Sequence, residues 1–171
     1  MKKIYKITPE VQAPELTIFG INEEILVGES LIGLSSEKSF EGSVNQLSEW
    51  NQFYRVGNDA FAITEEAWEN CMDMYYTIIE NDVELLSVVA NGQDFRVIHP
   101  RQFLPSSNSP DEICDLTYVN ALFRIENRLP REVFCFEGMS VQGNEFKYNY
   151  DQFSFKGLSF EEVWSEDGKL V

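Results

Sequence analysis

The pattern of apolar and polar positions predicts one amphipathic helix in the middle of the chain. After Thr64, apolar side chains recur at the three- and four-residue spacing of one helix face. They are Trp68, Cys71, Met72, Tyr75, Ile78 and Ile79. Thr64 can act as N-cap by accepting a hydrogen bond from a free backbone N–H, and the acids Glu65 and Glu66 suit the positive end of the helix dipole. We therefore expect a helix that begins after Thr64 and ends near Asn81.

A β-hairpin is predicted directly after this helix. The run from Val83 to Ala90 is rich in β-forming apolar residues and is followed by Asn91 and Gly92. Asn-Gly tolerates the positive φ angles of a type I′ turn, which is a common two-residue connection between antiparallel strands. We expect residues 83–90 to pair with residues 93–100, in a register that the pattern leaves open.

Further strands are predicted on both sides of this helix and hairpin. Alternating or β-rich runs occupy residues 3–8, 116–125, 132–137 and 155–164. Residues 16–34 fit two short strands or a strand and a loop, and residues 138–151 fit a short helix or a mobile loop. Helices and strands do not alternate, so a doubly wound parallel sheet is not expected. The prediction is an α+β fold with one main amphipathic helix and a mainly antiparallel sheet.

Length and composition indicate a folded protein with no membrane segment. The chain has 171 residues, of which 43% are hydrophobic and 13% aromatic, enough for a buried core. We expect a single globular domain over 1–171, with a core at 59–164, an N-terminal part at 1–58 and a tail at 165–171. No run approaches the roughly 20 apolar residues that cross a bilayer, and no apolar segment follows the N-terminal lysines. Three widely spaced cysteines suit a reducing compartment, so we expect a cytoplasmic protein.

The net charge of −16 is the strongest bulk property, and it is unevenly distributed. Between Ser39 and Phe95 there are eleven acids and one base, Arg55. Such a field repels nucleic acid and anionic membranes and attracts cationic partners. Five arginines in the second half could form a basic patch, but the net charge opposes nucleic-acid binding. The acidity could also serve solubility alone, which leaves an acidic structural or regulatory module as one alternative.

No motif in the sequence predicts catalysis, a metal or a cofactor. His99 is the only histidine, and nothing at zinc-site or catalytic-triad spacing accompanies it. Paired acids such as Glu65-Glu66 and Asp111-Glu112 point in different directions on a helix or strand. Phosphate-binding glycine loops and the EF-hand pattern are missing. We expect no catalytic residue, although carboxylates gathered only by the fold would still allow a small enzyme.

Short segments of the second half carry a family resemblance. They are Leu122-Phe123-Arg124, Val133 to Phe136, and Lys156-Gly157-Leu158-Ser159-Phe160. Their order, after a helix with an acidic start, resembles the immunity proteins of bacterial polymorphic toxin systems, in particular immunity-protein family eleven and its relatives, formerly a domain of unknown function. The resemblance covers about residues 60–164, and Gly143 and Asn144 interrupt the segment that should precede Lys156. It implies a small cytosolic protein without catalytic residues that neutralises a cognate toxin domain by binding it.

Acidic residues are the predicted partner-binding residues. Glu66, Glu69, Asp73 and Glu80 step by three, four and seven positions, so they can share a helix face opposite Trp68. Asp111 and Glu112 lie in the most loop-like segment of the chain. We expect these six residues to bind a basic toxin domain, because opposite charge speeds encounter and disfavours wrong partners. For each residue the alternative is an ordinary solvated charge.

Overall fold

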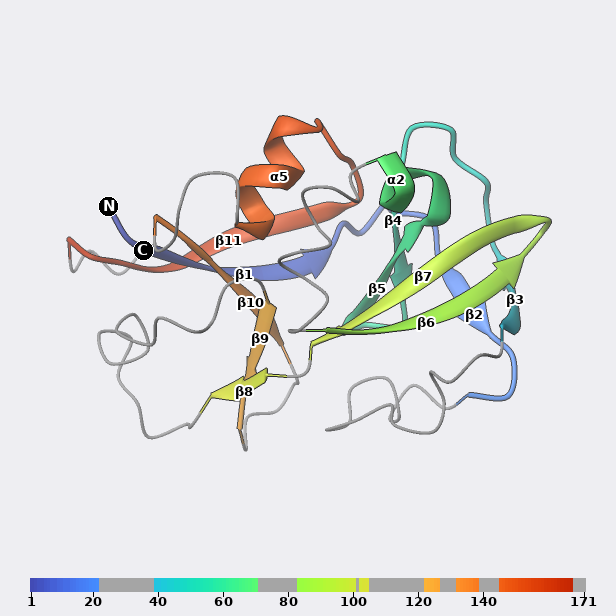
Figure 1. Ribbon diagram of the computed structural model, residues 1–171, viewed down its shortest axis with the longest axis horizontal. Helices are drawn as coiled ribbons and strands as arrows, with labels where there is room; N and C mark the ends of the chain where they lie inside the picture. Colours follow the sequence, from blue (N-terminus) through green and yellow to red (C-terminus); the bar gives the residue numbers. More distant parts are fainter. Residues whose placement is uncertain are drawn as a thin grey trace.

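The computed structural model describes residues 1–21, 39–70, 83–100, 102–104, 122–126, 132–138 and 145–167 (Figure 1). Within these ranges the chain forms two β-sheets and two short helices. In chain order the elements are β1 (Lys3–Pro9), β2 (Leu16–Ile18), β3 (Phe40–Val44), β4 (Phe53–Val56), β5 (Ala60–Thr64), α2 (Glu65–Asn70), β6 (Val83–Ala90), β7 (Gln93–Pro100), β8 (Gln102–Leu104), β9 (Leu122–Ile125), β10 (Val133–Glu137), α5 (Phe146–Gln152) and β11 (Leu158–Ser165).

The first sheet has five strands in the order β11-β1-β10-β9-β8. Its pairs are antiparallel except for β8 and β9, which run parallel. The N-terminal strand β1 lies between two strands from the end of the described chain, so that Lys3 is opposite both Glu137 and Ser165. The predicted strands at 3–8, 132–137 and 155–164 are therefore neighbours in one sheet.

The second sheet has six strands in the order β2-β3-β6-β7-β5-β4, and it closes on itself. Its edge strands meet where Glu15 and Arg55 form a parallel bridge. There the Arg55 N–H donates to the Pro14 carbonyl over 2.8 Å, and the Arg55 guanidinium lies 3.2 Å from the Glu15 carboxylate. The backbone groups at both edges are therefore partly paired with each other, which protects strand edges from other chains.

The predicted hairpin is confirmed. Strands β6 and β7 cover residues 83–90 and 93–100, and Asn91 and Gly92 have φ angles of 52° and 77° between them. The register that the sequence left open places Ala90 opposite Gln93 and Val83 opposite Pro100. Positive φ at both turn residues is the geometry of a type I′ turn, so the Asn-Gly signal identified the right connection.

The start of the predicted helix is confirmed, but a single main helix is not. Helix α2 begins at Glu65, and the Ala67 N–H donates to the Thr64 hydroxyl over 3.3 Å as expected of an N-cap. Residues 71–82, which hold most of the predicted apolar face, lie outside the described residues. Strands dominate the described structure, and α5 adds a second short helix. The fold is thus α+β in the coarse sense, with sheet as its main component.

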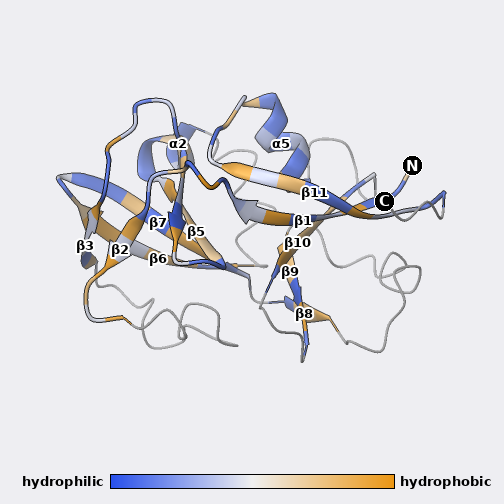
Figure 2. Cartoon of the chain, turned by 180° about the vertical axis from the view of Figure 1, so that it is seen from behind, coloured by the Kyte–Doolittle hydropathy of each residue, from blue (hydrophilic) through white to orange (hydrophobic). Residues whose placement is uncertain are grey.

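Buried side chains form three clusters. One cluster lies inside the closed sheet and contains Tyr54, Leu86, Phe95 and Val97. A second lies between the two sheets and under α2 and α5, where Phe53 is the central ring. The third covers the other face of the first sheet, where Phe123 stacks with Phe134 and Phe136. In Figure 2 the strands carry the hydrophobic stretches, whereas α5 is mostly hydrophilic on the side that is seen.

Candidate functional site

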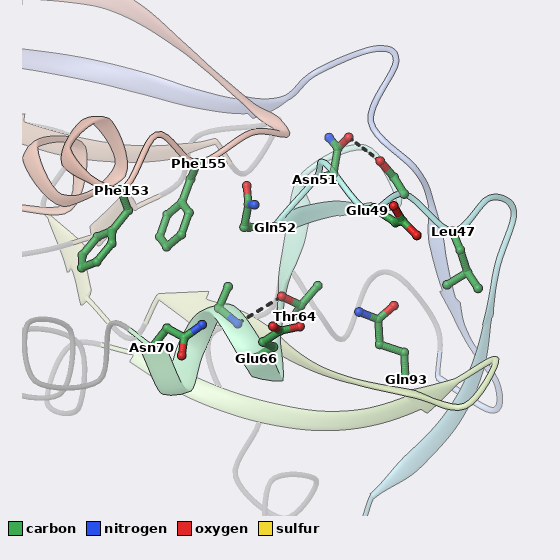
Figure 3. Close-up of a pocket in the computed structure, with 12 residues that line it drawn as sticks. Leu47, Glu49, Asn51, Gln52, Thr64, Glu66, Asn70, Gln93, Phe153 and Phe155 are labelled. Carbon is green, nitrogen blue, oxygen red and sulfur yellow. Dashed lines mark hydrogen bonds between the residues drawn. The ribbon is translucent and has the colours of Figure 1, made fainter.

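A pocket of about 600 Å³ opens beside α2, at the junction of segments that are far apart in the sequence (Figure 3). Three walls surround it: the helix α2, the loop 47–52 before β4, and the segment 153–155 that follows α5. The hairpin contributes one residue, Gln93. The lining residues are Leu47, Ser48, Glu49, Asn51, Gln52, Thr64, Glu66, Ala67, Asn70, Gln93, Phe153 and Phe155. We refer to this pocket as the α2 pocket.

The helical wall is held in place by contacts on its other side. Trp68 is buried beneath α2, and the Glu65 carboxylate accepts two hydrogen bonds from Arg96, at 2.5 Å from Nε and 2.7 Å from Nη2. The same guanidinium lies 5.5 Å from the centre of the Trp68 ring. Glu65 is thus paired with Arg96 on that side, whereas Glu66 is exposed and lines the pocket.

The loop wall is anchored on a tyrosine from the closed sheet. The Tyr54 ring is fully buried, and its hydroxyl accepts from the Ser48 N–H at 3.1 Å and donates to the Ser48 carbonyl at 3.2 Å. The Ser48 hydroxyl then donates to the side chain of Asn51 at 2.9 Å. With Ser48 fixed at its base, the loop presents Glu49 and Trp50 to solvent.

The third wall owes its shape to the end of α5. Ser154 has a φ of 54°, the Phe155 N–H donates to the Tyr150 carbonyl, and the Ser154 N–H donates to the Asp151 carbonyl, both at 3.1 Å. These are the two hydrogen bonds of a Schellman motif, which ends a helix with one left-handed residue. Phe153 and Phe155, on either side of Ser154, stack on each other, with ring centroids 5.3 Å apart and ring planes 15° apart.

A close backbone approach joins this third wall to the loop wall. Gly157 has a φ of 117°, and a Cβ at that position would collide with the Phe53 carbonyl. The Phe53 N–H donates to the Lys156 carbonyl at 3.0 Å, and the Lys156 N–H donates to the Gln52 side-chain oxygen at 2.8 Å. Only glycine permits this approach without strain, so Gly157 holds two walls of the α2 pocket together.

The pocket combines free charge, amides and aromatic surface. Between residues that the structure describes, no ion pair involves Glu49 or Glu66. Amide side chains come from Asn51, Gln52, Asn70 and Gln93, and exposed apolar side chains stand at the rim. These are Leu47 and Phe153, which are 54% and 36% exposed, and in the same loop Trp50, which does not line the pocket, is 80% exposed. Such a surface can bind a cationic group and a polar backbone together with apolar side chains.

The structure places the predicted partner-binding residues in different surroundings. Glu66 lines the α2 pocket. Glu69 is also exposed, but it lines a separate hollow of about 290 Å³ with Glu65 and Arg96. The other four, Asp73, Glu80, Asp111 and Glu112, lie outside the described residues. The structure therefore brings Glu66 together with residues that sequence reasoning missed, above all Glu49 and the stacked phenylalanines. Trp50, next to Glu49, would be expected from its size to be a core anchor, but it is 80% exposed in the structure.

The histidine and the one cysteine among the described residues are deeply buried. His99 is 1% exposed, in agreement with a structural histidine. Cys135 lies in the core between the sheets, where burial raises the pKa of its thiol. Arg96 is paired with Glu65, and Arg124 is buried, so neither adds to an exposed basic patch. Within the described ranges, no cluster of histidine, cysteine and acidic side chains could hold a metal ion, and no helix is long and apolar enough to cross a membrane.

Comparisons with protein-family models, with curated proteins and with solved structures found no match to this chain. The resemblance to immunity proteins, carried by Leu122 to Arg124, Val133 to Phe136 and Lys156 to Phe160, therefore stays a prediction. Those segments belong to strands β9, β10 and β11 of the first sheet and to the turn that precedes β11. Their pattern is therefore explained by the packing of the sheet and does not indicate a binding site.

Proposed function

We propose that this chain is a non-enzymatic, cytoplasmic binding protein of the immunity type, which neutralises a basic bacterial toxin domain by direct contact. The observation that carries this proposal is the α2 pocket, where two carboxylates with no cation partner among the described residues lie beside exposed Leu47 and Phe153. The loop that forms one of its walls also exposes Trp50, next to Glu49. Aromatic anchors surrounded by polar groups are the usual centres of protein interfaces.

The charge of the whole chain supports a basic partner. A net charge of −16 produces a field that accelerates the approach of a positively charged protein and repels nucleic acid. A toxin domain that acts on nucleic acid has to be basic to bind its substrate. An acidic inhibitor can therefore associate quickly with such a domain without competing for the nucleic acid itself.

The test is a direct binding and protection experiment. The purified chain is mixed with the toxin domain encoded beside its gene, and binding is followed by calorimetry while co-expression is scored for growth. We expect a 1:1 complex, rescued growth, and an association rate that falls as salt is added. The proposal fails if the folded chain neither binds nor protects against that domain.

Matched variants show whether the α2 pocket is the contact surface. Trp50→Ala removes an 80% exposed ring from the loop that forms one pocket wall, and we expect it to weaken binding by about 2 kcal/mol or more, as for an interface anchor. Phe19→Ala removes another exposed ring, 55% exposed after β2, and should leave binding unchanged. If the acidic and Trp50 variants all retain full binding, the α2 pocket is not the contact surface. If the unaltered chain binds no toxin domain at all, the acidity serves solubility and the chain is a structural or regulatory module.

A further inference from the structure

We infer that the α2 pocket binds an extended segment of the partner through one arginine, whose guanidinium is held by Glu66 and Glu49 and lies against the Phe153–Phe155 stack. This inference rests on the proposed function, because it assumes a basic protein partner, and it adds the chemistry of the contact. It also explains why carboxylates, amides and aromatic rings are gathered at one place.

Size and shape favour a segment of chain over a flat protein surface. At about 600 Å³, the hollow is in the range of sites that enclose peptide or small-molecule ligands. Glu49 reaches it from the loop wall, Glu66 from α2, and the phenylalanines from the turn after α5 (Figure 3). A side chain that enters between these walls therefore meets charge on two sides and an apolar surface on the third.

Charge complementarity selects a cation as the inserted group. Glu49 and Glu66 are exposed, and neither is in an ion pair with another described residue. Two carboxylates in one hollow repel each other, and a cation placed between them removes this repulsion while gaining charge-assisted hydrogen bonds. An anionic or purely apolar segment would instead leave both carboxylates desolvated and uncompensated.

Arginine suits the pocket better than lysine. Its planar guanidinium can donate bidentate hydrogen bonds to a carboxylate while its flat face stacks on an aromatic ring, whereas lysine offers a compact, strongly hydrated charge. The opposite side of α2 shows the same combination within this chain: Arg96 binds both oxygens of Glu65 and lies 5.5 Å from the centre of the Trp68 ring. The α2 pocket presents a carboxylate and rings with no arginine of its own among the lining residues.

Amide groups around the arginine position fit an extended backbone. Gln52 accepts a hydrogen bond from the Lys156 N–H, which leaves its NH₂ group as a donor on the pocket wall. Asn70 and Gln93 stand at two ends of the lower wall (Figure 3), and each amide carries both donors and an acceptor. An extended segment exposes its N–H and C=O groups, so these side chains can hydrogen-bond it without demanding a particular sequence.

The experiment uses the full chain and a fluorescein-labelled peptide, with binding read by fluorescence anisotropy. The peptide carries arginine and leucine two residues apart between serines, because such side chains lie on one side of an extended chain. Sister peptides replace the arginine with lysine or with uncharged citrulline. We expect the arginine peptide to bind best, the lysine peptide more weakly, and the citrulline peptide not at all in the same concentration range.

Variants of the chain locate the contact. Glu66→Gln and Glu49→Gln should each weaken binding of the arginine peptide about tenfold, as expected for the loss of one charge-assisted partner. Glu41→Gln removes an exposed carboxylate on β3, outside the pocket, and serves as the matched control. Phe153→Ser should weaken the arginine peptide more than the lysine peptide. All four residues have exposed side chains, and thermal unfolding checks that the variants stay folded.

The outcomes separate this inference from the proposed function. If Glu41→Gln weakens the peptide as much as Glu66→Gln, or if citrulline binds like arginine, the pocket is not an arginine site and the inference is overturned. If the Glu49→Gln, Glu66→Gln double variant still neutralises the toxin domain, the proposed immunity function holds although the pocket is not an arginine site. If the peptides bind in the expected order but the chain neutralises no toxin domain, the α2 pocket is an arginine-binding site and the proposed immunity function is wrong.

Discussion

The hydroxyl of Tyr150 in α5 binds both backbone groups of Leu158 at the start of β11: it accepts from the Leu158 N–H at 3.0 Å and donates to the Leu158 carbonyl at 3.2 Å. Strand β11 is an edge of the first sheet. Directly after β1, the Glu10 N–H donates to the Gly157 carbonyl. In the alternating antiparallel ladder, the backbone groups of the next residue, Leu158, therefore point away from β1. The Tyr150 hydroxyl therefore provides hydrogen-bond partners for both backbone groups that Leu158 presents at the open edge of the sheet.

Replacing Tyr150 with phenylalanine should destabilise the protein by about 1–3 kcal/mol, because it leaves a buried N–H and a buried carbonyl without their partner. The ring and its contacts with Phe53 and Phe155 stay in place, so the loss reports on the hydroxyl. Urea unfolding of the two proteins measures the difference. Tyr148→Phe, which alters a neighbouring tyrosine on α5, is the control and should change stability by less. Equal effects would mean that the Leu158 hydrogen bonds contribute nothing.

Stability should fall as the pH rises from about 10 to about 12. Burial, together with the Glu137 carboxylate that accepts a hydrogen bond from its hydroxyl, raises the pKa of Tyr5 to about 12, and burial raises the pKa of Tyr150 to about 12. The unfolded chain releases these protons near pH 10, so above that pH it binds fewer protons than the folded chain and unfolding is favoured. Below pH 10 this contribution is fully present.

The alkaline effect can be measured by urea unfolding at several pH values, alongside tyrosinate absorbance. Tyr5→Phe and Tyr150→Phe each remove one of the late-titrating groups and should flatten the pH dependence of the unfolding free energy. A wild-type stability that stays constant up to pH about 12 would contradict the prediction.

Gly157→Ala should cost about 2–4 kcal/mol, the combined size of a left-handed backbone penalty and a steric overlap. The added methyl group would meet the Phe53 carbonyl and push β4 from the turn that carries Phe155. Gly20→Ala is a matched control, since Gly20 has a φ of 76° but open space around its Cβ position. Thermal unfolding should show a clearly smaller loss for Gly20→Ala. Similar losses at both sites would mean that the close approach at Gly157 is not tight.

Ser154→Gly should stabilise the protein by about 0.5–1 kcal/mol. Ser154 holds a φ of 54° after α5, and the left-handed conformation costs a non-glycine residue about 1–2 kcal/mol, partly offset by the greater freedom of glycine in the unfolded chain. The Ser154 side chain is exposed, so little packing is lost. Urea unfolding measures the change, and a destabilised Ser154→Gly protein would show that the serine side chain stabilises the turn.

Local signals made the hairpin and the helix start predictable. Asn91 and Gly92 determine the turn by their own backbone preferences, and Thr64 caps the helix that follows it directly. These features depend on residues within a few positions of one another. The β-rich run at 116–125 likewise indicated a strand, and in β9 neighbouring side chains lie on opposite faces: Leu122 joins the cluster between the sheets and Phe123 the cluster on the other face.

The candidate site could not be predicted in the same way, because its walls meet through contacts between distant segments. Gln52 and Lys156 are 104 positions apart, and the bond between them helps to place Phe155 opposite Glu66. Periodicity could show that Glu66 is exposed, but not which residues face it. It also could not separate Glu66 from Glu69, which line different hollows: Glu66 lines the α2 pocket, whereas Glu69 lies with Glu65 and Arg96 in the other hollow.

The central place of β1 has a consequence for how the protein is made. The strand leaves the ribosome before its two partners, β10 and β11, so Lys3 can pair with Glu137 and Ser165 only after those later segments have been made. All six strands of the closed sheet are translated in the meantime. Throughout that interval both edges of β1 are open to other chains, which is a known route to aggregation. We therefore expect that the yield of folded protein depends on how well a nascent Lys3–Pro9 segment is shielded during synthesis.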